Sequence, residues 1–188
     1  ITYMPHFISL VVICSLIREF TLDTGVINYI LGFLGFTPTS LLNFPQYFTT
    51  VYVASGIWQE IGWGSIIYLA ALSGLDPALY EAATIDGANR FDQMLHVTLP
   101  GILPTIIIML ILKLGQVLSV GYEKIILLYN DNTMSVADVI STYVYAKGLL
   151  DLDWSFSSAV GLFNSIINFL FLNAANFISK KTSEYSLW

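Results

Sequence analysis

Residues Tyr80–Pro100 read YEAATIDGANRFDQMLHVTLP, a polar segment between two long apolar stretches. The pair Asp76-Pro77 stands just before this segment. An acidic residue at the N-cap followed by proline at the first helical position is typical of a helix start. The sequence therefore predicts a helix that begins at Pro77 and runs into the polar segment.

A turn is predicted to end this helix at Asp86-Gly87, because glycine readily adopts the positive φ that such a turn requires. Asn89 is a suitable N-cap for a second short helix. One face of that helix would carry the apolar residues Phe91, Met94 and Leu95. We call residues 73–100 the elbow: two short helices and a turn, with small side chains on one arm and an apolar knob on the other. Such a shape fits a groove on another protein, and a plain polar connection between two spans is the alternative.

The composition indicates a membrane protein. Of the 188 residues, 56% are hydrophobic and 11% are charged, whereas a soluble domain is about 25% charged. The mean hydropathy is +0.73. A net charge of −6 with seven basic residues argues against a nucleic-acid partner, which would need a basic surface. The single cysteine, Cys14, cannot form an internal disulfide, and we interpret it as a small buried apolar residue.

A membrane-spanning helix needs about 20 predominantly apolar residues, and four stretches come close. They are Ile1–Ile17, Phe48–Leu72, Gly101–Tyr122 and Phe156–Ile178. Because the chain starts within an apolar run and not at Met, we interpret it as a fragment and its first stretch as the remainder of a span. The predicted fold class is all-α, a polytopic membrane protein.

The connections between these spans carry helical signals of their own. Thr21–Tyr47 is interrupted by glycines and prolines, which favours a short interfacial or re-entrant helix. Glu123–Trp154 has apolar residues at helical spacing, which predicts an amphipathic helix along a surface. These residues are Val136, Val139, Ile140, Tyr143 and Val144. The positive-inside rule does not choose an orientation, since Arg90, Lys180 and Lys181 stand against Arg18, Lys124 and Lys147.

The elbow resembles the EAA loop in the permease subunits of binding-protein-dependent ABC importers. The signature of that loop is Glu-Ala-Ala, three residues, Gly, nine residues, an aliphatic residue that is usually Ile, any residue, and Leu-Pro. It is matched here by Glu81-Ala82-Ala83, Gly87, Val97 and Leu99-Pro100, with Val97 in place of Ile. More widely, stretches such as ISTYVYAKGL (140–149) and the ending YSLW are similar to the carbohydrate-type permeases of the LplB-like polysaccharide transport group.

The resemblance implies a type I ABC importer permease core, of which this chain would hold the last four of about six transmembrane helices. It implies a single permease domain over 1–188, a cytoplasmic coupling loop at 73–100 and an extracellular loop at 123–154. The coupling residues would be Glu81, Ala82, Ala83 and Gly87, with their neighbours Asp86, Asn89, Arg90 and Phe91.

The same resemblance implies the partners. The elbow would dock on an ATP-binding subunit, so ATP hydrolysis is expected there and not in this chain. A second permease subunit and an extracellular lipid-anchored or periplasmic sugar-binding protein complete the expected assembly, in the cell membrane and with no cofactor. The expected function is import of oligosaccharides by alternating access.

Five polar residues are predicted to line a translocation path or to be buried in protein, because polar side chains in lipid must face protein or water. They are Glu60, Lys113, Gln116, Asn164 and Asn168. In the last span, Asn164 and Asn168 share one helix face with Ser157, Gly161 and Ser165. Packing between helices is the alternative role for that face.

Glu60 and Lys113 lie at matching depths if the elbow runs from Leu72 to Gly101, since each is about 18 Å from the cytoplasmic boundary at 1.5 Å per residue. An isolated charge near the midplane costs about 2.5–3.5 kcal/mol, so we hypothesise a Glu60–Lys113 ion pair. The alternatives are that Lys113 faces the aqueous path, or that Glu60 pairs with a missing span or the second permease.

Other functions have weaker support in the sequence. It contains no P-loop signature, no Gly-x-Ser-x-Gly and no His-Glu-x-x-His. His6 and His96 do not have metal-ligand spacing, and we interpret both as interfacial. The alternative from another class is an ion-gradient-driven secondary carrier or channel, which would place acidic residues on a midplane relay. Only Glu60 offers a signal of that kind.

Overall fold

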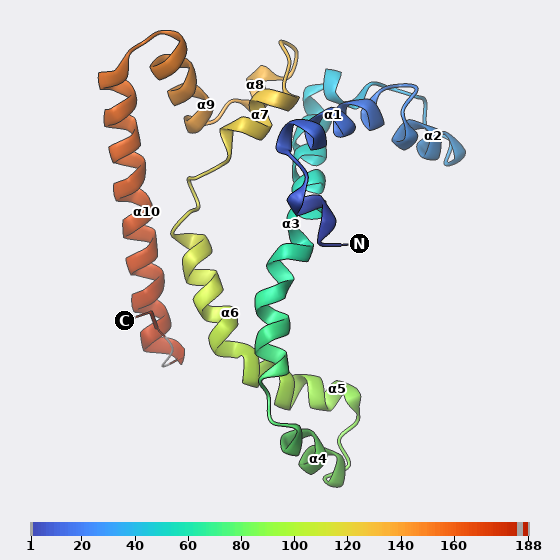
Figure 1. Ribbon diagram of the computed structural model, residues 1–188, viewed down its shortest axis with the longest axis vertical. Coiled ribbons are helices and arrows are strands. Elements are labelled where there is room, and N and C mark those ends of the chain that lie inside the picture. Colours follow the sequence, from blue (N-terminus) through green and yellow to red (C-terminus); the bar gives the residue numbers. More distant parts are fainter. Residues whose placement is uncertain (1, 184–185, 188) are drawn as a thin grey trace. The chain divides into compact units, whose positions relative to one another are not determined.

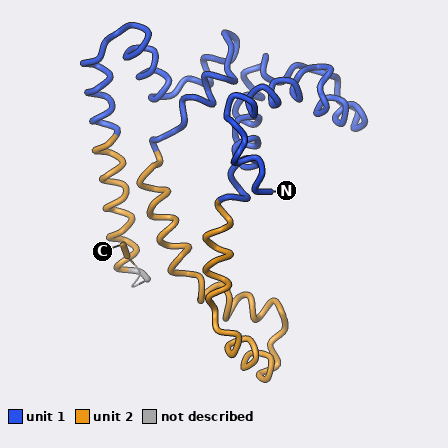
Figure 2. The backbone as a smooth tube through the Cα atoms, viewed as in Figure 1, with its two compact units in different colours: residues 1–63, 118–164 blue, residues 64–117, 165–188 orange. Residues whose placement is uncertain are grey.

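The computed structural model describes residues 2–183, 186 and 187, and every regular element in that part of the chain is helical. Figure 1 shows these helices in chain order. The chain divides into two compact units, coloured separately in Figure 2. The first unit holds residues 1–63 and 118–164, and the second holds residues 64–117 and 165–188. The long helices α3 (Pro45–Ser73) and α10 (Trp154–Ser183) contribute to both units.

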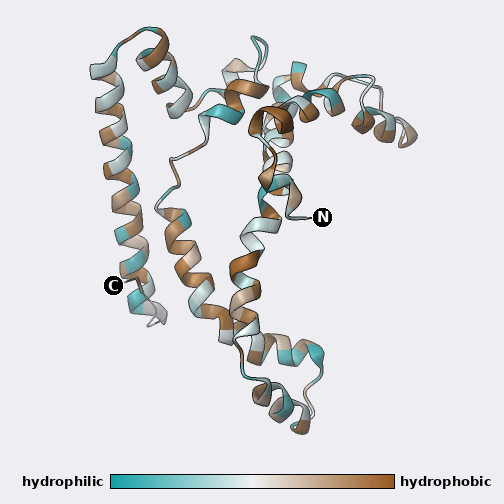
Figure 3. Ribbon diagram, viewed as in Figure 1, coloured by the Kyte–Doolittle hydropathy of each residue, from teal (hydrophilic) through white to brown (hydrophobic). Residues whose placement is uncertain are grey.

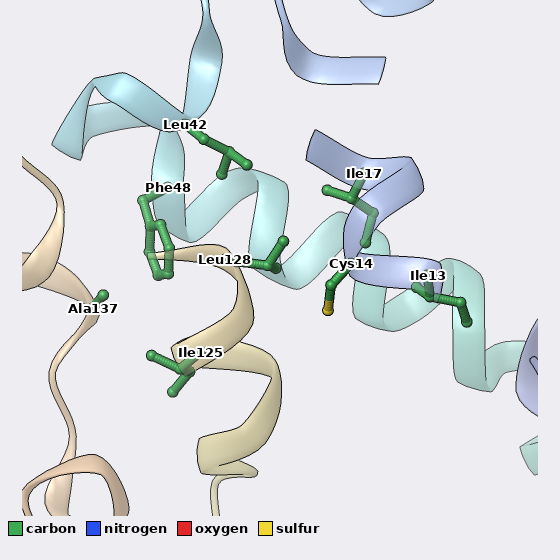
Figure 4. Close-up of a cluster of buried hydrophobic side chains, with 8 residues drawn as sticks. All are labelled: Ile13, Cys14, Ile17, Leu42, Phe48, Ile125, Leu128 and Ala137. Atoms are coloured by element: carbon green, nitrogen blue, oxygen red, sulfur yellow. The ribbon is translucent and has the colours of Figure 1, made fainter. Parts of the chain in front are cut away.

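The first unit packs short helices against the beginning of α3. These are η1 (Met4–Phe7), α1 (Leu10–Thr21), α2 (Val26–Phe33), η2 (Leu41–Asn43), α7 (Tyr122–Leu128), α8 (Met134–Ala137), α9 (Ile140–Tyr145) and η4 (Ala146–Leu150). The buried apolar core, drawn in Figure 4, consists of Ile13, Cys14, Ile17, Leu42, Phe48, Ile125, Leu128 and Ala137. Cys14 is buried, which confirms its interpretation as a small apolar core residue.

The prediction that Ile1–Ile17 is the remainder of one continuous span is wrong, because the described part of this stretch forms two separate helices. The short 3-10 helix η1 contains Pro5, and the backbone is extended at Ile8 (φ −82°, ψ 138°) before α1 begins. α1 has 12 residues, a length of about 18 Å, which is too short for a bilayer core of about 30 Å. Its Ile13, Cys14 and Ile17 pack in the core of the first unit.

The connections also differ in part from the prediction. The short helix expected within Thr21–Tyr47 is confirmed as α2. The single amphipathic helix expected in Glu123–Trp154 is wrong, because α8 and α9 are separate helices. Val139 between them is extended (φ −134°, ψ 169°), and its backbone N–H donates to Thr142 Oγ1 at 2.8 Å. This hydrogen bond caps the start of α9, so a second helix begins where the spacing of apolar residues had indicated a single continuous helix.

The second unit contains the elbow and the helices that leave it. Its elements are the end of α3, α4 (Pro77–Ile85), α5 (Arg90–Gln93), η3 (Met94–Thr98), α6 (Leu99–Leu114) and the end of α10. Two helices in the described part of the chain are long and apolar enough to cross a membrane, Arg90–Leu114 and Trp154–Lys181. Figure 3 shows apolar residues along most of α6 and hydrophilic residues on α5. The helix predicted at Phe48–Leu72 is confirmed as α3, whose 29 residues measure about 44 Å.

The span predicted at Gly101–Tyr122 ends earlier than expected, at Leu114. A turn follows, in which the N–H of Gly115 donates to the carbonyl of Ile111 and the N–H of Gln116 to that of Lys113. A Cβ added to Gly115 would lie 2.6 Å from Leu172 Cδ1 of α10. Glycine therefore permits close packing of α6 against α10 at the point where α6 stops.

Candidate functional site

The first arm of the elbow is α4, and both its ends are built as the sequence predicts. The Asp76 carboxylate accepts a hydrogen bond from the N–H of Ala78 at 2.9 Å, which caps the helix behind Pro77. At the other end Gly87 has φ +82°. The N–H of Gly87 donates to the Thr84 carbonyl at 3.1 Å, and the N–H of Ala88 donates to the Ala83 carbonyl at 2.9 Å. This pair of bonds is a Schellman motif, which satisfies the last carbonyls of the helix.

The second arm begins at Asn89, which the sequence also predicts as a cap. Asn89 Oδ1 accepts from the N–H groups of Phe91 at 2.8 Å and Asp92 at 3.1 Å. Asp92 Oδ2 in turn accepts from the N–H of Asn89 at 3.2 Å, which completes a capping box. Local hydrogen bonds therefore fix both helices and the turn between them.

Side-chain hydrogen bonds tie the two arms together, and the sequence reasoning missed these residues. Gln93 Nε2 donates to Thr84 Oγ1 at 2.9 Å and to the Ala88 carbonyl at 3.4 Å. The hydroxyls of Tyr80 and Thr98 lie 3.0 Å apart and share a hydrogen bond. These contacts join residues 9 and 18 positions apart along the chain, a separation at which no helical periodicity signals a partner.

The surface of the elbow presents both charge and apolar area. Glu81, Ala82, Asp86, Gly87 and Arg90 are exposed. Large apolar side chains stand beside them, with Ile85 86% and Phe91 66% exposed. The structure thus places the eight predicted coupling residues on one compact element, with exposed apolar side chains on both arms among polar ones. Such a surface is suited to insertion into a groove on another protein.

A π-helical segment connects the elbow to the span. In η3 the N–H of Leu99 donates to the carbonyl of Met94, five residues earlier. Pro100 follows at once; it has no N–H, and in a regular α-helix its ring would crowd the carbonyl of His96. The wider π turn relieves that crowding and keeps Arg90–Leu114 helical throughout. A displacement of the second arm would therefore be transmitted directly into α6.

The five polar residues predicted for the translocation path fall in both units. Glu60 and Asn164 belong to the first unit, while Lys113, Gln116 and Asn168 belong to the second. Lys113 and Gln116 are exposed near the end of α6, and Asn164 and Asn168 are half-buried on α10. The Glu60–Lys113 ion pair stays a prediction, because the two residues lie in different units.

Within the first unit Glu60 has a partner that the sequence reasoning did not foresee. Its Oε2 atom lies 3.2 Å from His6 Nδ1. The imidazole ring of His6 stacks on the indole of Trp63, with ring centroids 4.5 Å apart and an interplanar angle of 2°. His6 therefore contacts both a carboxylate and an aromatic ring. The sequence-based interpretation of His6 as an interfacial residue did not predict either contact.

Lys124 is a second feature that the sequence reasoning missed. Its side chain is buried in the core of the first unit, and Nζ has no hydrogen-bond partner within the described part of the chain. The ammonium lies 5.4 Å from the centroid of the Tyr52 ring, a cation–π distance. Burial lowers the pKa of Lys124 below the ordinary value for lysine.

The described residues hold no group of three or more His, Cys, Asp or Glu side chains that could bind a metal ion. The polar groups of the elbow and the spans include amides, hydroxyls, charged side chains and the His96 imidazole. They can bind and orient a partner or a polar solute.

The described part of the chain is all-helical, with a capped elbow that leads into an apolar helix long enough to cross a membrane. The profile of the family described as "Binding-protein-dependent transport system inner membrane component" matches residues 1–184, and the chain belongs to this family. The resemblance drawn from the EAA signature is thereby confirmed.

Two curated relatives come from Bacillus subtilis (strain 168). Protein LplB is 43% identical over 99% of this chain and 59% of its own length. The polygalacturonan/rhamnogalacturonan transport system permease protein YteP is 42% identical over 99% of this chain and 58% of its own length. The chain thus spans about three fifths of the length of these relatives.

The crystal structure of a bacterial alginate ABC transporter, in complex with an alginate pentasaccharide-bound periplasmic protein, contains a similar chain. The TM-score is 0.94 at 41% sequence identity, with 100% of this chain and 65% of that chain covered. The predicted fold class, the helical core of a type I ABC importer permease, is confirmed.

Proposed function

We propose that this chain is part of the permease subunit of an ATP-driven importer that moves oligosaccharides across the cell membrane by alternating access. The observation that carries the proposal is the elbow, a rigid polar element that displays Ile85 and Phe91 next to the Glu81-Ala82-Ala83 and Gly87 signature. Lipid is a poor cover for Ile85 and Phe91, because charged side chains stand beside them in the elbow. A groove on a partner protein can accommodate both apolar side chains.

The arrangement in the membrane follows from this assignment. Residues 73–100 form the cytoplasmic coupling loop of a single permease domain, and residues 123–154 form the extracellular loop. An ATP-binding subunit receives the elbow and hydrolyses ATP, so this chain itself is not an enzyme. A second permease subunit and a sugar-binding protein at the outer face complete the transporter.

The class of substrate is supported by the relatives. YteP is named for the transport of polygalacturonan and rhamnogalacturonan, and the similar solved transporter for alginate. Oligosaccharides of uronic acids are therefore the first substrates to test. Galacturonan oligosaccharides and alginate pentasaccharide are suitable probes, and maltopentaose is a neutral probe for comparison.

The test uses the full-length permease in its complete complex, reconstituted in proteoliposomes with ATP-binding subunits and binding protein. We expect uptake of at least one probe that requires ATP, together with ATP hydrolysis that rises when the loaded binding protein is added. Uptake that follows an imposed ion gradient and ignores ATP would instead identify a secondary carrier and overturn the proposal.

A further inference from the structure

A pocket in the first unit lies outside the elbow and has a chemistry of its own. It has a volume of about 310 Å³ and is formed by the start of α7, by α9 with η4, and by the beginning of α10. The residues that matter for its chemistry are Tyr122, Ser141, Tyr145, Trp154, Ser157 and Asn164. Pockets that bind small organic groups have about this volume and combine apolar walls with a few polar atoms.

Aromatic rings supply one wall. The rings of Tyr122 and Tyr145 are stacked, with centroids 5.4 Å apart and an interplanar angle of 26°. Trp154, which also lines the pocket, is 57% exposed. An aromatic face carries negative charge density, and the C–H groups on the flat side of a sugar ring are weakly positive and apolar. The wall is thus suited to stacking against a pyranose.

Three oxygen atoms of the pocket offer acceptor capacity. Asn164 Oδ1 is buried and has no hydrogen-bond partner within the described residues. The Ser157 hydroxyl already donates to the Val144 carbonyl at 3.2 Å, and the Ser141 hydroxyl donates to the Val120 carbonyl at 2.7 Å. Each serine oxygen therefore keeps only acceptor capacity toward the pocket. A ligand that brings hydroxyl donors complements these three acceptors.

The backbone around the pocket is shaped for it. A Cβ on Gly148 would lie 2.5 Å from Ser157 Oγ, so only glycine lets η4 approach α10 this closely. η4 is a π-helical segment, a form that occurs frequently at functional sites. The buried acceptor of Asn164 is costly unless a donor reaches it. A site that retains such an acceptor beside stacked aromatic rings is built for a ligand.

We propose that this pocket is a carbohydrate subsite, in which a sugar ring of the imported chain stacks on the aromatic wall and donates a hydroxyl hydrogen bond to Asn164 Oδ1. The inference rests on the proposed function. It places the subsite at the outer end of α10, next to the extracellular loop, where the oligosaccharide enters the membrane part. The subsite reads the hydroxyl face of the sugar and not its charge.

The first test measures protection from a thiol reagent in the reconstituted complex. Leu149 lines the pocket and is 51% exposed, whereas its neighbour Leu150 is 67% exposed and does not line it. Leu149→Cys and Leu150→Cys are each made in a Cys14→Ala background and labelled with a water-soluble maleimide. We expect alginate pentasaccharide or galacturonan oligosaccharide to slow labelling at Leu149→Cys about threefold or more, with no change at Leu150→Cys.

The second test uses Asn164→Leu, with Asn173→Leu as the matched control. Asn173 lies on the same helix, is half-buried like Asn164, and donates to the Phe169 carbonyl at 2.7 Å. We expect Asn164→Leu to raise the KM of uptake about five- to tenfold, as loss of one neutral hydrogen bond does, and to remove the protection of Leu149→Cys. The control should change neither, and Tyr122→Leu, which removes one stacked ring, should also weaken the protection.

The outcomes separate this inference from the proposed function. ATP-dependent uptake without any protection at Leu149→Cys overturns the subsite and leaves the importer intact. Equal protection of both cysteines also overturns it, because the effect would then not be local. Absence of ATP-dependent uptake for every probe counts against the importer itself.

Discussion

Replacement of Gly87 tests whether the turn of the elbow has a role in coupling that is separate from assembly. Gly87 has φ +82°, and a Cβ placed there would meet no atom of the described chain within 4 Å. A side chain at this position therefore acts through the backbone and not through a clash. The left-handed conformation costs an ordinary L-residue about 1–2 kcal/mol, and a β-branched valine is disfavoured there more strongly. This cost lowers the equilibrium constant for the turn about 5- to 30-fold.

The effect should stay local. α4 has nine residues, too few for a helix to be stable by itself in water, so the elbow depends on its caps and turn. In proteoliposomes that contain the complete transporter, we expect Gly87→Val to lower ATP-dependent uptake at least tenfold while its amount in the membrane stays normal. Gly87→Asn should keep most of the activity, because asparagine tolerates this backbone conformation.

Gly35 provides a matched control outside the elbow. It has φ +85°, and again no described atom lies within 4 Å of an added Cβ. Gly35→Val therefore introduces the same strain at the end of α2 and should leave uptake largely intact. Uptake at the wild-type level in Gly87→Val, or an equal loss in Gly35→Val, would refute a specific role of the elbow turn in coupling.

Three further predictions concern charge. Glu81→Lys is expected to abolish uptake and stimulated ATP hydrolysis. Membrane insertion should stay normal, because Glu81 is exposed on the elbow and lies in no protein core. Co-purification with the ATP-binding subunit measures the loss of docking. The double variant Glu60→Lys with Lys113→Glu should assemble and transport better than the worse of the two single variants. If it does not, the Glu60–Lys113 pair is refuted, and His6 is the partner of Glu60. Lys124→Met should raise the Tm of the purified protein by about 2–4 °C at pH 7, the shift that 1 kcal/mol gives in a chain of this size. Because burial lowers the pKa of Lys124, the unfolded chain binds the proton more readily. Wild-type stability should therefore rise with pH from the lowered pKa toward about 10.4, and Lys124→Met should lack that rise.

The local signals of the elbow could be read from the sequence because each acts within a few residues. Asp76 caps α4 through Ala78, Gly87 supplies the positive φ, and Asn89 reaches only as far as Asp92. The same locality explains why the helical nature of α3, α4 and α10 was predictable. The signature residues Glu81-Ala82-Ala83 then gave the family, which the comparisons confirm.

Features that depend on distant partners could not be predicted. His6 meets Glu60 across 54 positions, and nothing in either neighbourhood marks the other. α6 ends at Leu114, and Leu172 of α10 lies against Gly115 just after it, a contact that hydropathy does not encode. The apolar residues of α8 and α9 keep helical spacing through Asp138 and Val139, so the periodicity concealed the break.

The exposed apolar residues of the elbow and those of the spans need different environments to remove them from water. Leu110 and Leu162 are 57% and 63% exposed on helices long enough to cross a bilayer, where lipid can cover them. Ile85 and Phe91 are exposed to a similar or greater degree, but they stand among Glu81, Asp86 and Arg90, whose charges would have to be desolvated in lipid. A protein surface with apolar depth and a polar rim could cover Ile85 and Phe91 and leave the neighbouring charges hydrated or paired. Under the proposed function the elbow is the docking element, and its continuous helix into α6 would give a docked partner a direct mechanical connection to the membrane.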